Sequence, residues 1–260
     1  MNKTTFIAGI SVAVLLAFGL SQAEDTSIDR SFSVSAGGTL YLDSDTGRVE
    51  IESHNADTVE VEVIKKGNNA ADFEVNFDHD DEDLTIKGDK DSSWGFGGFS
   101  LSVTYIIKVP EDYNLKLKTG GGSIYIEDLK GNVDAKTSGG SITLGDIDGD
   151  VEVKTSGGSI RVEEVAGNIN AHTSGGSVRA KLSKQLTDDC KLTTSGGSVS
   201  VFLTPKMAVD IEASTSGGRV RSEFDVDGTV KKTKIVGTIN GGGPLLKLRT
   251  SGGSVSINEL

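Results

Sequence analysis

The chain has 260 residues, with 26 Lys and Arg against 38 Asp and Glu, and therefore a formal net charge of −12. This acidic balance argues against nucleic acid or an anionic membrane surface as a general partner. The single cysteine, Cys190, excludes an internal disulfide and a cysteine-based metal cluster. The 34 glycines and the lack of helical periodicity favour an all-β protein.

Residues 1–23 have the layout of a secretory signal peptide. Lys3 gives a basic start, residues 6–20 form an uncharged apolar run, and Ser21-Gln22-Ala23 offers a cleavage site. The run is shorter than the ~20 residues needed to span a bilayer. We therefore expect cleavage, no transmembrane segment afterwards, and an exported protein that is periplasmic, secreted or on the cell surface.

Residues 24–115 contain short runs of alternating apolar and polar side chains, separated by turn signals. Val59–Val63 and Phe73–Phe77 are typical of half-buried strands, and Asp45-Thr46-Gly47 is typical of a turn. We predict a β-rich region that caps the N-terminal end of the structure formed by the residues after it. An open sheet edge would invite pairing with another chain, so a cap is expected.

Two segments of this region allow more than one interpretation. Residues 91–99 carry Trp94, Phe96 and Phe99 among glycines, which suits either a hairpin tip folded onto the sheet or a contact loop for a partner or sugar. Residues 78–83 are acidic and lie between two expected strands. A solvated turn is the simpler interpretation, because metal ligation needs oxygens that converge on one point.

A motif of the form Thr-Ser-Gly-Gly-Ser-Ile/Val occurs seven times, with small variations, in residues 116–260. The copies begin at Thr119, Thr137, Thr155, Thr173, Thr194, Thr215 and Thr250. The intervals are 18, 18, 18, 21, 21 and 35 residues, as in a solenoid that carries loops on some coils. Apolar residues alternate on both sides of each motif, so each repeat predicts two short strands. We predict a parallel β-solenoid of stacked two-strand coils.

The motif itself has an architectural interpretation. Glycine adopts positive φ and has no Cβ to collide with the next coil at a sharp corner. Thr and Ser hydroxyls can bond along the stack or satisfy corner backbone groups. A phosphate-binding glycine loop would have to open a helix, and no helical pattern follows. Cys190 falls in the apolar column of Val151 and Ile169, where a buried thiol is expected.

Stacking also turns outward residues into columns of like charge. Lysines recur directly before the motif threonine and arginines recur two residues after the motif serine or its equivalent; the candidate ligand face is Lys118, Lys136, Lys154, Arg161, Arg179 and Arg221. Neighbouring carboxylates can balance these charges in an ordinary solvated face. The alternative is a face that binds an anionic glycan or another envelope polymer.

Other chemistry finds little support in the sequence. Asp146–Asp150 and Asp225–Gly228 superficially suggest calcium loops, but neither has the longer spacing with a closing Glu. His54, His79 and His172 are far apart in sequence, and no acidic pair recurs outside turns. We therefore expect no catalytic residue, no metal and no cofactor. A polysaccharide-processing enzyme built on a β-helix stays open as a minor alternative.

Over nearly its whole mature length the chain resembles the bacterial putative-adhesin proteins, a family of β-strand repeat proteins of unknown function. The resemblance rests on Gly37–Leu40, Gly47–Ile51, Ile107–Pro110 and the Thr-Ser-Gly-Gly-Ser array. It implies a right-handed β-solenoid in the cell envelope and an adhesin-like role without known catalytic residues. The expected function is thus non-enzymatic binding or scaffolding, with envelope polysaccharide or another envelope protein as partner. A structural or stress-responsive envelope protein that acts through a protein partner is the other possibility.

Overall fold

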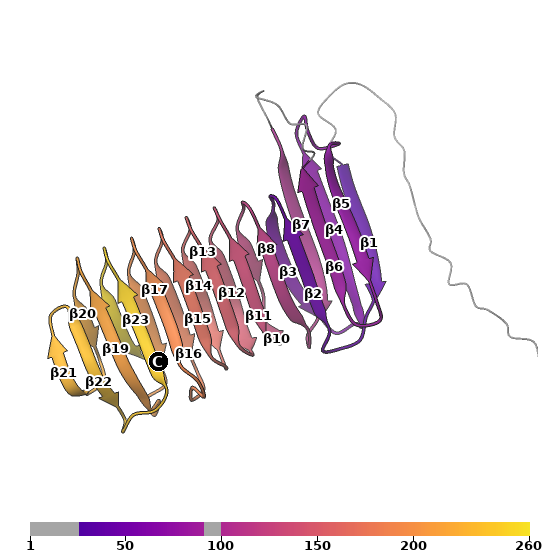
Figure 1. Ribbon diagram of the computed structural model, residues 1–260. Helices are drawn as coiled ribbons and strands as arrows, with labels where there is room; N and C mark the ends of the chain where they lie inside the picture. The colour runs from indigo at the N-terminus through magenta and orange to yellow at the C-terminus, as the bar shows by residue number, and fades with distance from the viewer. Residues whose placement is uncertain (1–25, 91–99) are drawn as a thin grey trace, which may run out of the picture.

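The computed structural model describes residues 26–90 and 100–260, and every regular element in them is a β-strand (Figure 1). The strands form two sheets of twelve strands each, with the hydrophobic core between them. In the described part of the chain, no helix is long and apolar enough to cross a membrane. The all-β prediction is confirmed, and most strand pairs are parallel. The right-handed winding implied by the resemblance stays a prediction.

Sheet A has the strand order β1 (Thr26–Ser33), β4 (Thr58–Lys66), β7 (Ser102–Pro110), β3 (Arg48–His54), β9 (Ile124–Ile126), β12 (Ile142–Asp148), β14 (Ile160–Val165), β16 (Val178–Leu182), β18 (Val199–Leu203), β24 (Val255–Glu259) and β20 (Val220–Ser222), and β10 (Leu129–Lys130) pairs with β12. Sheet B has the order β21 (Asp227–Lys231), β22 (Lys234–Ile239), β19 (Val209–Thr215), β23 (Leu245–Thr250), β17 (Cys190–Thr194), β15 (Ile169–Thr173), β13 (Val151–Thr155), β11 (Val133–Thr137), β8 (Asn114–Thr119), β2 (Thr39–Ser44), β6 (Leu84–Lys90) and β5 (Phe73–His79).

Each regular coil has one strand in each sheet, joined by a Thr-Ser-Gly-Gly-Ser corner. In one coil β13 runs in sheet B, residues 155–159 form the corner, and β14 runs in sheet A. Val151 and Val153 of β13 are buried between the sheets, whereas Glu152 and Lys154 point outward. Period-two alternation in the sequence therefore decides which side chains enter the core.

Successive coils stack in register, so equivalent side chains form columns. The buried columns predicted from the alternation are confirmed: Ile124, Ile142, Ile160 and Val178 in sheet A, and Val133, Val151 and Ile169 in sheet B. Complete burial of one such aliphatic side chain is worth about 1.5–3 kcal/mol. Since a single coil cannot shield its own apolar side, the stack supplies the stability.

Two ladders of hydroxyl groups run along the corners. The Thr155 hydroxyl donates to the carbonyl of Gly140 in the preceding coil at 2.7 Å, and the backbone N–H of Ser159 donates to the Ser141 hydroxyl at 3.2 Å. The threonine bond recurs in the coils of Thr137, Thr173, Thr194, Thr250 and Thr215. The hydroxyls thus satisfy corner backbone groups from one coil to the next, as the sequence predicts.

The second glycine of a corner is required by the closeness of the coils. A Cβ on Gly158 would lie 2.3 Å from the carbonyl oxygen of Gly140, and one on Gly157 of the same corner would lie 2.9 Å from that of Gly139. A Cβ on Gly139, in the preceding corner, would meet nothing nearer than 3.9 Å. Among the motif glycines that the structure describes, only Gly122 has a positive φ, 107°. The expectation of positive φ is therefore wrong at the other corners. The expectation of no room for a Cβ holds at the second glycine of every corner and, from Gly157 onward, at the first glycine as well.

The coils do not stack in chain order at the C-terminal end. β23 lies between β17 and β19 in sheet B, and β24 lies between β18 and β20 in sheet A. The last coil in the sequence, residues 245–259, is therefore inserted between two coils that precede it. The 35-residue interval is not a simple loop on a coil, because it contains the β21–β22 hairpin and the return of the chain into the stack.

The N-terminal end has a similar exchange of order. The coil of β6 and β7 stacks outside the coil of β2 and β3, which in turn contacts β8 and β9. Beyond it, β4 and β1 extend sheet A and β5 extends sheet B, each antiparallel to its neighbour. Figure 1 shows these longer strands side by side at the end of the row of coils.

Candidate functional site

The six cations predicted from the sequence as one ligand face lie on opposite faces of the molecule. Lys118, Lys136 and Lys154 are on β8, β11 and β13 of sheet B. The arginines lie on β14, β16 and β20 of sheet A; they are Arg161, Arg179 and Arg221. The single-face grouping is wrong because the lysines precede the corner and the arginines follow it, and the corner moves the chain from one sheet to the other.

Two lysines in the N-terminal half of the sheet B column, Lys118 and Lys136, are balanced by carboxylates. The Lys118 ammonium lies 3.0 Å from Asp43, and the Lys136 ammonium lies 2.9 Å from Asp134 and 3.7 Å from Glu152. The pKa of Lys136 is raised, first by its hydrogen bond to Asp134. All of these groups are substantially exposed, so each pair adds about 1 kcal/mol or less to stability. This part of the column is an ordinary solvated face.

The same column continues without ion pairs toward the C-terminal end. Lys154 is followed on successive strands by His172, Thr193, Arg249, Ser214 and Lys234. In the described residues, Lys154, Arg249 and Lys234 form no ion pair, and all three are exposed. The inserted β23 places Arg249 directly beside Thr193, whereas chain order would have placed Ser214 there.

His172 sits within this column. Its Nδ1 lies 2.8 Å from the Thr193 hydroxyl oxygen. Its pKa is lowered from the ordinary value, first by burial and then by the positive charges of Lys154 and Lys191. A lowered pKa favours the neutral imidazole, which separates the cations without adding to their charge.

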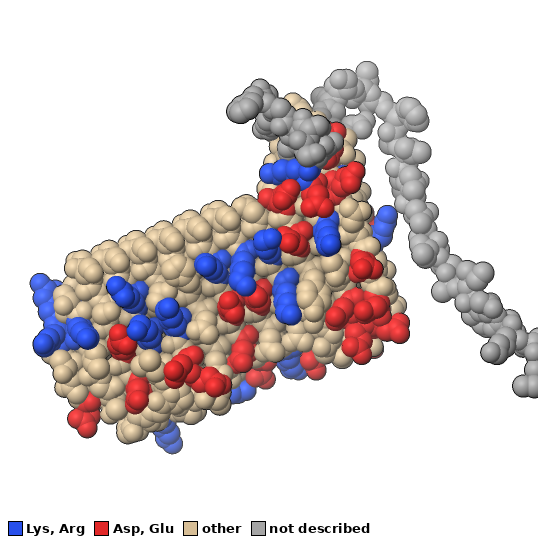
Figure 2. Space-filling model, in the orientation of Figure 1, with Lys and Arg blue, Asp and Glu red and all other residues tan. Residues whose placement is uncertain are grey.

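Four further lysines on sheet B were missed by the sequence analysis. Lys191 is on β17, one column away from His172, and the β21–β22 hairpin carries Lys231, Lys232 and Lys234. Figure 2 shows positive side chains gathered at the end of the molecule where Figure 1 places this hairpin. The run Lys231-Lys-Thr-Lys234 was the available signal. Lysines at an exposed edge also oppose pairing with another sheet, which is their simplest role on β21.

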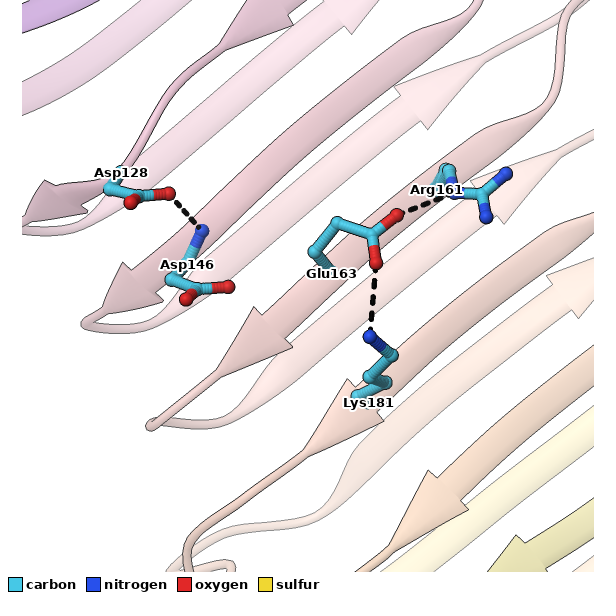
Figure 3. A network of polar contacts seen from close by, with 5 residues as sticks. All are labelled: Asp128, Asp146, Arg161, Glu163 and Lys181. Atoms are coloured by element: carbon cyan, nitrogen blue, oxygen red, sulfur yellow. Dashed lines mark hydrogen bonds and ion pairs between the residues drawn. The ribbon is translucent and has the colours of Figure 1, made fainter. Parts of the chain in front are cut away.

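Sheet A carries a different polar network (Figure 3). Glu163 accepts from Arg161 at 2.6 Å and from Lys181 of the next coil at 3.0 Å. Its pKa is lowered by these two bonds, the Arg161 bond first. Arg179 lies over the ring of Phe202 at 4.2 Å. Two of the three sheet A arginines thus have partners within the protein.

An open groove of about 500 Å³ runs beside this network on the side away from the corners. Asp128, Asp146 and Glu164 line it, and the Asp128 carboxylate accepts from the backbone N–H of Asp146 at 2.9 Å (Figure 3). Burial, followed by the charges of Asp128 and Glu164, raises the pKa of Asp146. Across residues 26–90 and 100–260, no three His, Cys, Asp or Glu side chains are placed to hold a metal ion.

The three histidines occupy separate places. The Nε2 atom of His54 lies 2.7 Å from the Thr58 carbonyl oxygen, that of His79 lies 2.7 Å from the Ser33 carbonyl oxygen, and His172 is in the sheet B column. Cys190 is buried, as its column predicts, and burial raises the pKa of its thiol. The three histidines and Cys190 therefore do not form a pair of an activated nucleophile and a base.

The remaining predictions fall on loops and ends. The acidic tip is an exposed turn between β5 and β6, in which the Asp80 carboxylate accepts from the backbone N–H groups of Glu82 and Asp83. These bonds lower the pKa of Asp80. The predicted signal peptide and the contact loop with Trp94, Phe96 and Phe99 lie outside the described residues.

Comparison with known proteins supplies the family. The family model described as Toastrack DUF4097 matches residues 39–162 and again 149–258. The chain belongs to this family. The family resemblance expected from the Thr-Ser-Gly-Gly-Ser array is thereby confirmed, for a family whose function is unknown.

Several solved structures resemble this Toastrack chain at low identity. A putative cell adhesion protein from Clostridium sporogenes is 15% identical, with a TM-score of 0.38, over 91% of this chain and 100% of its own. A putative adhesin from Bacteroides fragilis is 13% identical, with a TM-score of 0.40, over 90% of this chain and 97% of its own. No curated protein matches the chain.

Proposed function

We propose that this Toastrack protein is a non-enzymatic, exported envelope protein that acts as an adhesin-like binding or scaffold protein through the outer surfaces of its two sheets. The observation that supports it is the stacking itself. Outward residues of neighbouring strands lie in columns about 4.8 Å apart, so each face presents rows of polar and charged groups to an extended partner. The names of the structural relatives agree with a role in adhesion.

Catalysis is the weaker proposal. A hydrolase or lyase site needs carboxylates or an activated base gathered in a cleft that excludes water. The groove of Asp128 and Asp146 is open. His54 adjoins it, since Ser53 and Glu111 line the groove and the Glu111 N–H donates to the His54 carbonyl, but the His54 imidazole contacts the Thr58 carbonyl oxygen. The envelope location is supported by the sequence of residues 1–23.

The test measures both the location of the protein in the cell and its binding to envelope material. Cell fractionation followed by mass spectrometry should find a chain that begins near Glu24 outside the cytoplasm. The purified mature protein should then be retained by sedimented envelope material, and a variant lacking residues 91–99 should show whether that loop takes part. A chain that keeps residues 1–23 in the cytoplasm, or one that is not retained, would contradict the proposal.

A further inference from the structure

The outer face of sheet B changes character half-way along the stack. Lys118 of β8 and Lys136 of β11 are neutralised by carboxylates, whereas Lys154, Arg249 and Lys234 have no ion pair among the described residues. The neighbouring Lys247 is neutralised by Glu212 at 3.0 Å. Along the column from Asp43 to Lys234, the uncompensated positive charges therefore lie on the C-terminal half; Lys116 and Lys87 are further exposed lysines of sheet B for which the described residues provide no ion pair.

The cations are spaced by the strands that carry them. Lys154 and Arg249 are three strands apart, and Arg249 and Lys234 are two strands apart. At ~4.8 Å per strand, these steps correspond to about 14 and 10 Å along the stacking direction. Lys191 lies one column to the side on β17, level with Lys247 on β23. The charges thus form a line that runs across the strands.

The groups between the cations are neutral and polar. His172, Thr193 and Ser214 occupy the intervening strands; His172 and Ser214 are half-buried, whereas Thr193 is buried and its hydroxyl contacts His172. Hydroxyl and imidazole groups can donate and accept hydrogen bonds with sugar hydroxyls. Cations separated by such groups suit a ligand in which acid groups alternate with neutral hydroxyl-bearing units.

We propose that this part of sheet B binds a linear acidic polysaccharide that lies across β13 to β22, with its acid groups over Lys154, Arg249 and Lys234. The inference rests on the proposed binding function and adds the ligand class and the site. Duplex DNA fits less well, because it carries one negative charge per ~1.7 Å of axis, against cations about 10–14 Å apart on a flat sheet. The insertion of β23 is essential to the site, because it brings Arg249 into the line.

The test measures binding of two polyanions to the mature protein by calorimetry at physiological salt. Hyaluronate carries a carboxylate on every second sugar, as the spacing of the cations favours, and polygalacturonate carries one on every sugar, while dextran is a neutral control. One variant combines Lys154→Glu, Arg249→Glu and Lys234→Glu. The matched control combines Arg161→Glu, Arg179→Glu and Arg221→Glu, which makes the same charge change on sheet A.

The proposal predicts that at least one polyanion binds and that the sheet B variant weakens its binding at least about a hundredfold, since each charged hydrogen bond is worth about tenfold or more. The sheet A control should bind within about threefold of the natural protein, and binding should weaken with salt. Thermal melting of both variants shows that each is folded.

Three results would overturn the proposal: equal loss in both variants, equal binding of dextran, or tighter binding of single-stranded DNA than of either polyanion. If the sheet B variant is still retained by envelope material as well as the natural protein is, this site is wrong and the proposed function stands. If neither protein is retained, the proposed function itself fails.

Discussion

At the scale of single residues, each position of the Thr-Ser-Gly-Gly-Ser motif has a separate structural task. The threonine hydroxyl donates a hydrogen bond to a glycine carbonyl of the neighbouring coil, and the serine hydroxyl accepts one from a backbone N–H of the coil after it. The second glycine lets one corner approach the next. These tasks follow from residue chemistry and were accessible from the sequence, except that crowding, and not positive φ, is what requires the glycine.

Two motif glycines of neighbouring corners, Gly158 and Gly139, should therefore respond differently to substitution. Gly158→Ala places a Cβ 2.3 Å from the Gly140 carbonyl oxygen, so the coils must move apart. We expect the free energy of unfolding to fall by about 1–3 kcal/mol. Gly139→Ala places its Cβ in ordinary contact with Gly121 at 3.9 Å and should change the free energy of unfolding by less than about 1 kcal/mol. Urea denaturation of the two variants measures both values, and a Gly158→Ala variant as stable as the natural protein would contradict this account of the corner.

At the scale of strands and coils, the period, the buried columns and the two-strand coil were predictable because they are local and repeated. The order of the coils was not. The segments Thr194–Ser200 and Thr250–Ser256 have the same sequence, Thr-Ser-Gly-Gly-Ser-Val-Ser, so the motif cannot tell which coil stacks on which. The separation of lysines and arginines onto two faces was likewise hidden, because the direction of the chain after the corner decides it.

The inserted coil has a direct consequence for truncation. Thr194 and Thr215 are 21 residues apart, the same interval as Thr173 and Thr194, whose coils stack directly. If residues 245–260 are removed, β19 and β20 can close onto β17 and β18, with Thr215 donating to Gly197 in place of Gly253. We expect the shortened protein to fold cooperatively with a lower free energy of unfolding, because the buried side chains of one coil are lost.

Amide hydrogen exchange tests this closure in the truncated protein. Backbone amides of β19 should remain protected, as in the full-length control measured under the same conditions. Complete loss of protection in β19 and β20 would mean that the inserted coil is needed to hold them in place.

At the scale of the whole molecule, the arrangement of charge depends on the arrangement of coils. The acidic tip of residues 80–83 lies at the N-terminal end, and Figure 2 shows acidic side chains gathered there and basic ones toward the opposite end. The net charge of the chain does not reveal this separation of acidic and basic side chains, because it is a sum over both faces and both ends. The basic line on sheet B exists only if β23 enters the stack between β17 and β19.

Disulfide trapping tests that order most directly. Ser200 and Ser256 are paired on β18 and β24, with their hydroxyl oxygens 3.0 Å apart, whereas Arg221 is one strand further along. With Cys190→Val as background, the pair Ser200→Cys and Ser256→Cys should form a disulfide within one chain, since neighbouring strands bring Cα atoms within the 4.4–6.8 Å range. The pair Ser200→Cys and Arg221→Cys should stay reduced at a separation of ~10 Å. Mass spectrometry that found the second disulfide and not the first would contradict the inserted coil and the cationic face that it builds.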